Sequence, residues 1–250
     1  MDIAQITDLH ISKDITQKKH GCVAYQSLID TLSAIESNHK NIKNLVITGD
    51  LSSDYSLESY LHIKNLLEKY PFKVSLLPGN HDDLKKMEMI LDEQISIENI
   101  DLSDIKILAY NFDTHVPGRV HGKLQESDIK NLIQELNNLK TTTQIILFTH
   151  HPIVPVGSKW IDEHICENNE FLIETLLSYK KLNFQIFCGH VHQDSYLKKN
   201  NIEFYSTPST CYQFKPYTDE FDIDKNVSYG YRVISLQDTA INSRVIRVVR

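Results

Sequence analysis

The chain has 250 residues, 41% of them hydrophobic, so it can bury a sizeable core as one large domain or two small ones. Lys and Arg number 26 against 33 Asp and Glu, and the formal net charge of -7 argues against binding to a nucleic-acid duplex. The chain opens on a strand-like segment instead of a basic and then apolar leader, and no run approaches about 18 apolar residues, so we expect a cytoplasmic protein that does not engage a membrane.

Short apolar runs alternate with stretches of helical period, which predicts an α/β fold. The strands expected in chain order are Ile3–Thr7, Leu45–Thr48, Lys73–Leu77, Ile105–Tyr110, Gln144–Thr149, Phe184–Cys188, Ile202–Ser206, Tyr231–Leu236 and Arg244–Val249. Helices are expected at 23–35, 57–67, Ser127–Leu139 (with Ser127 as its N-cap) and Asn169–Tyr179. The last third, strand after strand, predicts antiparallel additions. Because no linker rich in Pro, Gly or Ser divides the chain, we expect a single domain over 1–250.

The four cysteines are far apart and form no CxxC pair: Cys22, Cys166, Cys188 and Cys211. This spacing argues against a zinc knuckle or a disulfide framework. We therefore expect buried free thiols.

Five short motifs fall where predicted strands end: TDLH at 7–10, GDLSSD at 49–54, PGNHDD at 78–83, THHP at 149–152 and GHVH at 189–192. In α/β sheets, ligand sites form beyond the carboxyl ends of the strands, where loops from distant parts of the chain converge. Each motif alone has an ordinary explanation, such as a helix cap, a turn or a core histidine. Together they predict one site rich in oxygen and imidazole ligands.

Carboxylate, carboxamide and imidazole groups without thiolates suit metals such as manganese, iron or zinc. The five motifs offer seven such ligands, more than one tetrahedral ion needs: Asp8, His10, Asp50, Asn80, His150, His190 and His192. If one carboxylate bridges, they divide into two sets of four, as in two-metal phosphoester sites with ions roughly 3.5 to 4 Å apart. Asp50, from the second motif, is the natural bridge.

The five motifs resemble the blocks of the calcineurin-like metallophosphoesterases, which are DxH, GDxxxD, GNH[DE], a histidine-containing block and GHxH in this order. The resemblance implies a two-sheet β-sandwich flanked by helices, with four αββα layers. It puts His81 beside the substrate. It assigns one metal to Asp8, His10, Asp50 and His192, and the other to Asp50, Asn80, His150 and His190.

A narrower resemblance, to the bacterial class III cyclic-AMP phosphodiesterases, covers nearly the whole chain. It lies in GDLSSDYSLESY, PGNHDD, VPGRVHGKL, HHPIVPVGSKWID, GHVHQD, TPSTCYQF and GYRVISL. The segment VHGKLQESDIKNLIQEL departs from the family pattern but contains no proposed ligand. The resemblance implies hydrolysis of 3',5'-cyclic nucleotides, cyclic AMP giving 5'-AMP, with a metal-activated water as nucleophile. Iron or manganese is the first expectation for the two divalent ions, with zinc and cobalt as alternatives.

The expected roles follow from this chemistry. Asp50 and His81 are the expected catalytic residues, and His81 would contact a phosphate oxygen or protonate the leaving group. The expected substrate-binding residues are His10, Asp50, Asn80, His81 and His192.

Residues around the ligand blocks carry weaker expectations. Asp54 and Asp82 either orient ligand histidines or lie in exposed turns, and His151 is either a hydrogen-bond donor to the site or a packed neighbour. The remaining expectations concern the nucleotide: Trp160 and His164 would cover it, and Tyr212 or Phe214 would stack on its base, unless these rings pack in the core.

Other readings stay open. The substrate could be a 2',3'-cyclic nucleotide, a glycerophosphodiester or a nucleotide-sugar lipid, although no long apolar insertion that could hold acyl chains is visible in the sequence. A non-catalytic metal-binding scaffold would be expected to lose ligands, and none is missing here. The sequence leaves the oligomeric state open, with a homodimer as one option.

Overall fold

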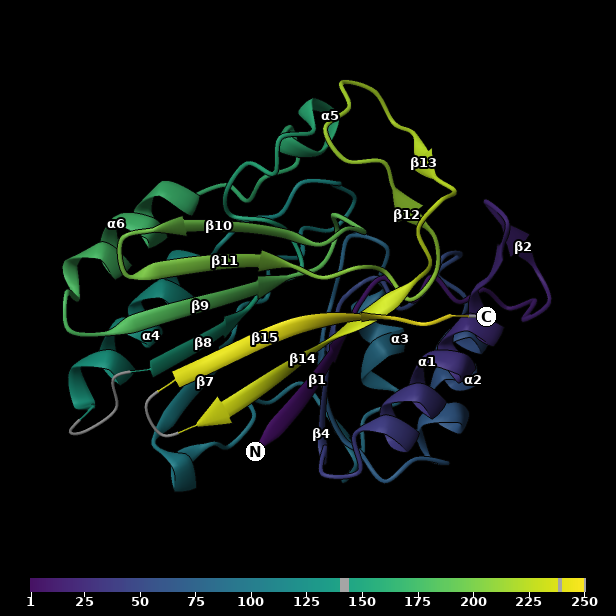
Figure 1. Cartoon of the computed structure of the whole chain (residues 1–250), viewed down its shortest axis with the longest axis horizontal. Helices are drawn as coiled ribbons and strands as arrows, with labels where there is room; N and C mark the ends of the chain where they lie inside the picture. The colour runs from purple at the N-terminus through teal and green to yellow at the C-terminus, as the bar shows by residue number, and fades with distance from the viewer. Residues whose placement is uncertain (140–143, 238–239, 250) are drawn as a thin grey trace.

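Two β-sheets pack face to face in the computed structural model, which describes residues 1–139, 144–237 and 240–249 (Figure 1). The first sheet has the order β15-β14-β1-β4-β5-β6, with bounds β1 Asp2–Ile6, β4 Asn44–Thr48, β5 Lys73–Leu77, β6 Ile95–Ser96, β14 Gly230–Gln237 and β15 Ala240–Arg247. The second has the order β10-β11-β9-β8-β7, with bounds β7 Ile107–Asn111, β8 Gln144–Phe148, β9 Asn183–Cys188, β10 Ser195–Lys199 and β11 Ile202–Ser206.

Helices cover the outer face of each sheet (Figure 1). The first sheet is covered by α1 (Ala24–Asn38), α2 (Leu57–Leu67) and α3 (Leu84–Glu88), and the second by α4 (Glu126–Asn138) and α6 (Asn169–Ser178). The smaller elements are β2 (Lys18–Lys19), β3 (Cys22–Val23), a 3-10 turn (Ser103–Ile105), α5 (Lys159–Asp162), β12 (Gln213–Phe214) and β13 (Ile223–Asp224).

Alternating side chains of the central strands explain why two sheets form with helices outside. Leu45 and Ile47 on β4 pack under the helices of the first sheet, whereas Val46 between them points into the interface between the sheets. On β9, Ile186 packs towards α4 and α6 and Phe187 towards the first sheet. Strands buried on both faces read as continuous apolar runs, with alternate residues on opposite faces. The expected two-sheet sandwich flanked by helices is confirmed.

Strand direction places the functional loops. β1, β4 and β5 are mutually parallel, as are β7, β8 and β9. The late strands supply the expected antiparallel additions, β10 against β11 and β14 against β1 and β15, although β11 itself runs parallel to β9. All five motifs follow the carboxyl ends of parallel strands.

The nine predicted strands all exist, with ends shifted by up to four residues. The prediction of Ser127 as an N-cap is wrong: the helix begins at Glu126, and the extended Gln125 precedes it with no side-chain capping hydrogen bond. β10 escaped prediction because four of its five residues are exposed and it lacks apolar alternation. The four cysteines are buried and form no disulfide, as expected.

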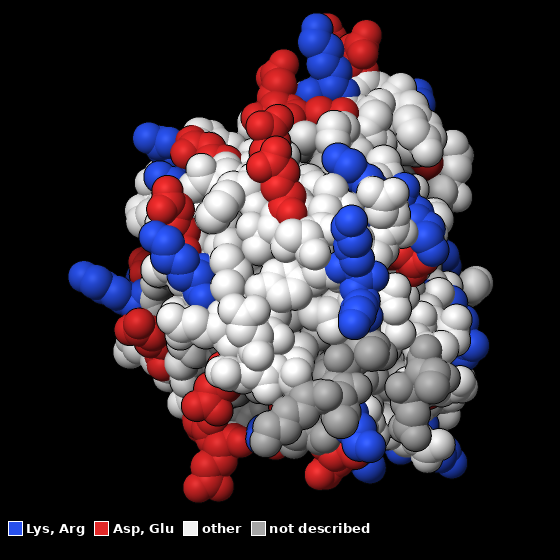
Figure 2. All heavy atoms as spheres, turned by 90° about the vertical axis from the view of Figure 1, so that its left-hand side faces the viewer, with Lys and Arg blue, Asp and Glu red and all other residues white. Residues whose placement is uncertain are grey.

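Two observations concern membranes and nucleic-acid duplexes, which the sequence argued against as partners. Among the described residues, no helix is both long and apolar enough to cross a membrane. On the face that Figure 2 presents, acidic and basic side chains are interspersed and form no broad basic patch.

Candidate metal centre

The five motif loops meet at one end of the sandwich and are joined by backbone hydrogen bonds. Asp8 N–H donates to the carbonyl of Gly49, and His10 N–H donates to that of Asp50. Across the two sheets, Asp8 Oδ2 accepts the N–H of His190 at 3.0 Å. The structure thereby brings together the seven residues that the sequence singled out, all from loops: Asp8, His10, Asp50, Asn80, His150, His190 and His192.

One group of atoms lies beside the end of β1. His192 Nε2 is 3.2 Å from Asp8 Oδ1 and 3.1 Å from His10 Nε2. His10 Nε2 is also 3.7 Å from Asp50 Oδ2. These atoms come from three loops and both sheets, and they are spaced as closely as the ligand atoms of one bound ion.

A second group lies beside the ends of β5 and β8. Asn80 Oδ1 is 3.1 Å from His150 Nε2 and 3.0 Å from His190 Nδ1. His150 Nε2 is 3.3 Å from the other carboxylate oxygen of Asp50, Oδ1. Asp50 therefore belongs to both groups, one oxygen in each, which is the geometry expected of a bridging carboxylate.

Backbone carbonyls fix the tautomers of two of these histidines. His150 Nδ1 lies 2.7 Å from the carbonyl of Thr48, and His192 Nδ1 lies 2.8 Å from the carbonyl of Tyr212. Because a carbonyl only accepts, each Nδ1 carries the hydrogen and each Nε2 presents its lone pair to the centre. The centre thus concentrates lone pairs: two imidazole nitrogens together with the carboxylate and amide oxygens around them.

Such a concentration of acceptors fits a bound cation. Asp8 Oδ1 is buried without a hydrogen-bond partner. Ligand atoms of Asp8, His10 and His192 lie within 4.8 Å of one another, and so do those of Asp8, Asp50 and His150. Buried acceptors facing one another repel and have lost water, so a divalent ion between them satisfies both requirements. The donor set, free of sulfur, suits manganese, iron or zinc.

The electrostatics of the residues in the centre follow from burial. Burial and the neighbouring Asp8 raise the pKa of Asp50 to about 7. Burial would also raise the pKa of Asp8, but the adjacent imidazoles, His192 first, hold it below its usual range. Burial lowers the pKa of His10 well below its ordinary value, so its imidazole is neutral at pH 7.

Asp54 and Asp82 do not orient the histidines. Asp54 is the turn residue that the sequence allowed, accepting the N–H groups of Lys13 and Ser56. Asp82 is neither of the expected alternatives: its buried carboxylate accepts the N–H groups of Leu51 and Gly79 and the hydroxyl of Tyr60. It therefore ties together the loops that carry Asp50 and Asn80.

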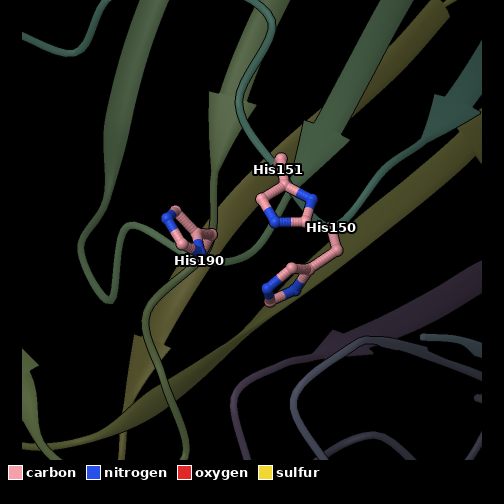
Figure 3. A group of neighbouring side chains, drawn as sticks. All are labelled: His150, His151 and His190. Atoms are coloured by element: carbon pink, nitrogen blue, oxygen red, sulfur yellow. The ribbon is translucent and has the colours of Figure 1, made fainter. Parts of the chain in front are cut away.

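His151 is a packed neighbour. Figure 3 shows His150 and His151 from one loop beside His190 from another, and their ring nitrogens are close enough to hold an ion. However, His151 Nδ1 lies 2.8 Å from the hydroxyl of Thr114, and its Nε2 lies 3.0 Å from the carbonyl of Val120. With both nitrogens engaged, His151 supports the loop and leaves no lone pair for the centre.

A cavity of about 260 Å³ opens over the centre, and five of the seven residues line it: His10, Asp50, Asn80, His190 and His192. His81 lines it, and its backbone N–H donates to Asp50 Oδ1 at 2.8 Å. Trp160 and His164 line it as expected, and three residues that sequence analysis missed join them: Lys19, His20 and Phe221. No motif marks these three: Lys19 ends the short strand β2, His20 follows it, and Phe221 lies between β12 and β13, so their positions depend on the tertiary fold.

Tyr212 or Phe214 is expected to stack on a base unless the ring packs in the core; both rings line the cavity, and each places one ring face against an imidazole of the centre. Tyr212 is parallel to His10 with ring centroids 5.4 Å apart, and Phe214 is parallel to His192 at 4.0 Å. Tyr212 is also nearly fully buried. Both rings therefore support imidazoles of the centre by stacking on them.

The comparisons with known proteins agree with this geometry. Residues 1–194 match the model of the calcineurin-like phosphoesterase family, so the chain belongs to that family of metal-dependent phosphoesterases. A dimetal phosphatase from Danio rerio has the same fold, with a TM-score of 0.68 at 12% identity over 100% of this chain and 99% of the other.

Two curated relatives match over most of their length. A probable cyclic nucleotide phosphodiesterase of Coxiella burnetii is 30% identical over 98% of this chain and 96% of its own. The 3',5'-cyclic adenosine monophosphate phosphodiesterase CpdA of Vibrio vulnificus is 32% identical over 94% of this chain and 85% of its own.

Proposed function

We propose that this protein hydrolyses 3',5'-cyclic nucleotides, converting cyclic AMP to 5'-AMP, at a centre of two divalent metal ions. The observation that carries the proposal is the convergence of seven side chains as two sets of acceptors that share Asp50. The activity named for the full-length relatives supports the choice of substrate.

The seven residues divide between the ions. Asp8, His10, Asp50 and His192 would hold one ion, and Asp50, Asn80, His150 and His190 the other. Iron or manganese is the expected metal, with zinc or cobalt as alternatives. When bound, the ions would supply an activated water and would offset charge on the phosphate oxygens.

The chain's own residues would position the substrate and move its protons. His81 faces the cavity, 5.4 Å from the ring of His10, and its bond to Asp50 fixes its loop. This position allows its imidazole to donate to a phosphate oxygen or to the departing 3' oxygen of the ribose. Lys19 is the only Lys or Arg among the described residues that line the cavity, and it favours an anionic substrate.

The size of the cavity favours a small diester. Its lining is mostly aromatic and polar, and Val120 and Ile161 are the only aliphatic side chains among the described residues that line it, which is little apolar surface for acyl chains. A nucleotide-sugar lipid is therefore a poorer fit than a cyclic nucleotide.

Three expectations from the sequence stay predictions. They are the single domain over 1–250, the cytoplasmic location and the oligomeric state, for which a homodimer is one option.

The test is release of 5'-AMP from cyclic AMP by purified protein that has been stripped with chelator and reloaded with Mn²⁺. Asp50→Asn should lose bound metal, measured by elemental analysis, and nearly all turnover, whereas the exposed Asp104→Asn should retain both. Turnover of 2',3'-cyclic AMP or a glycerophosphodiester without any release of 5'-AMP from the 3',5'-cyclic substrate would overturn the proposal.

A further inference from the structure

The cavity has an aromatic wall that none of the metal-site residues contributes. His20 lies in the turn between β2 and β3, Trp160 lies on α5, and Phe221 lies between β12 and β13. All three side chains line the cavity over the metal centre. Three separate segments of the chain thus bring planar rings to the opening of this cavity.

The rings form a continuous path from the metal centre to solvent. Phe214 stacks on His192, and its ring meets Trp160 at 4.9 Å and Phe221 at 5.4 Å between centroids. Trp160 and Phe221 meet edge to face at 5.3 Å. Phe221 is therefore two ring contacts away from a side chain of the metal centre, so a ligand held there could reach Phe221 with its far end.

Phe221 is the ring with free surface. It is 51% exposed, whereas Tyr212 and Phe214 are covered on one face by imidazoles. The Trp160 indole is fixed by a hydrogen bond from its Nε1–H to Thr218 Oγ1 at 3.3 Å. An exposed phenyl ring beside a preformed cavity is an apolar surface available to a ligand.

His20 extends this surface. Its ring centroid is 5.8 Å from that of Phe221 and 4.7 Å from that of Tyr212. Burial and the adjacent Lys19 lower the pKa of His20, which keeps its imidazole neutral at pH 7. A neutral imidazole and a phenyl ring both offer π faces to a flat heterocycle.

We propose that Phe221, with His20 and Trp160, is the subsite that stacks on the base of the nucleotide. The inference rests on the proposed function for the position of the phosphate, which lies at the metal centre while the ribose spans the gap to the rings. Stacking is tolerant of base identity because every base has a π face. The subsite therefore selects nucleotides over baseless diesters and discriminates little between adenine and guanine.

Trp160 provides a direct measurement, since it is the only tryptophan of the chain. Titration of the metal-loaded protein with 5'-AMP should quench its fluorescence, and ribose 5-phosphate should quench far less. Phe221→Ala should raise the Kd of 5'-AMP about tenfold, within the range that loss of one stacking contact produces. Phe221→Tyr keeps a ring and should bind like the wild type.

Kinetics separate a role in base binding from a structural role. Phe221→Ala should raise KM for cyclic AMP about tenfold and change kcat less than twofold. Hydrolysis of a ribose 3',5'-cyclic phosphate without a base should be unaffected. Phe171→Ala, which removes an exposed phenyl ring from α6, is the matched control and should change none of these values.

Two results would overturn the base subsite: unchanged affinity of Phe221→Ala for 5'-AMP, or an equal loss of activity on the baseless substrate. Failure of the proposed function is distinguishable. If the wild type hydrolyses no 3',5'-cyclic phosphate, the fluorescence comparison of 5'-AMP with ribose 5-phosphate still decides whether these rings bind a base.

Discussion

At the residue scale, the metal centre depends on unusual backbone conformations. Five of the seven proposed ligands have positive φ, between 48° and 63°: Asp8, His10, Asp50, His190 and His192. Residues with a Cβ seldom adopt this region, and such conformations cluster at functional sites where the surroundings enforce them. Here the hydrogen bonds between the loops hold the backbone so that short side chains turn back towards one point.

The glycines of these loops are needed for space as well as for conformation. A Cβ at Gly79 would lie 2.2 Å from Asp50 Oδ1, which is far inside contact distance. Gly79→Ala should therefore displace the Asp50 carboxylate, reducing metal content and lowering turnover by more than about tenfold. Elemental analysis and initial rates measure this.

Gly118→Ala is the control for that substitution. Gly118 has φ 74° with no atom near a Cβ, so alanine there meets only conformational strain. It should cost about 1 kcal/mol of stability and leave metal content unchanged. If both variants retained full metal, the steric account of Gly79 would be wrong.

A substitution of His81 should lower the rate of hydrolysis without loss of bound metal. Its side chain lines the cavity but belongs to neither acceptor group, so His81→Ala should retain both ions and lower kcat by roughly 10²- to 10⁴-fold, as loss of a general acid does. His39→Ala, at the end of α1, should change neither value. Loss of metal from His81→Ala would contradict the assigned role.

At this scale the sequence could predict which side chains form the site, but not which backbone groups hold them in place. The seven residues that the structure brings together could be singled out because the motifs contain their residue types at the right spacing. The carbonyls of Thr48 and Tyr212, which fix two imidazoles, could not be found, since every residue has a carbonyl and only the folded geometry selects which one accepts.

At the element scale, strand period and length were enough to predict the central strands, because burial on both faces gives short apolar runs. Exposed or very short elements lack that signal, which is why β10 and the β2–β3 and β12–β13 hairpins were missed. These hairpins carry His20 and border Phe221, so the aromatic wall escaped prediction for the same reason.

One buried cation links the two sheets next to the last ligand loop. Arg232, on β14 of the first sheet, donates to the Thr207 hydroxyl at 3.1 Å and to the Ser206 carbonyl at 2.8 Å, beside the second sheet. It also pairs with Asp194, two residues after His192, at 2.5 Å. Arg232 is 2% exposed.

Arg232→Met should lower the free energy of unfolding by about 2 to 4 kcal/mol, because it leaves buried acceptors without a donor. Urea denaturation monitored by circular dichroism measures the change. Arg119→Met is the comparison: Arg119 is largely exposed and pairs with Glu167 at 3.3 Å, and its loss should cost under about 1 kcal/mol. Equal effects of the two substitutions would show that burial of Arg232 contributes little.

At the scale of the whole molecule, the centre lies across the seam of the sandwich. Loops from the first sheet carry Asp8, His10, Asp50 and Asn80, and loops from the second carry His150, His190 and His192. The sequence predicted that the loops converge, because parallel strands end at one edge. It could not predict how the lone pairs face one another, since that depends on how the two sheets pack.

This position makes metal binding a cross-link between the sheets and therefore a contribution to global stability. A ligand present at about 100 times its Kd stabilises the folded state by about 2.7 kcal/mol, and each kcal/mol shifts Tm by roughly 2 to 4 °C in a chain of this size. Mn²⁺ added to chelator-stripped protein should thus raise Tm by several degrees in differential scanning calorimetry. Asp50→Asn should lose most of this shift because it removes the negative charge that both groups share and replaces one of the two bridging oxygens by an NH2 group, whereas Asp104→Asn should keep it. A Tm unaffected by Mn²⁺ in the wild type would mean that the acceptor groups do not hold ions across the seam, whatever their spacing.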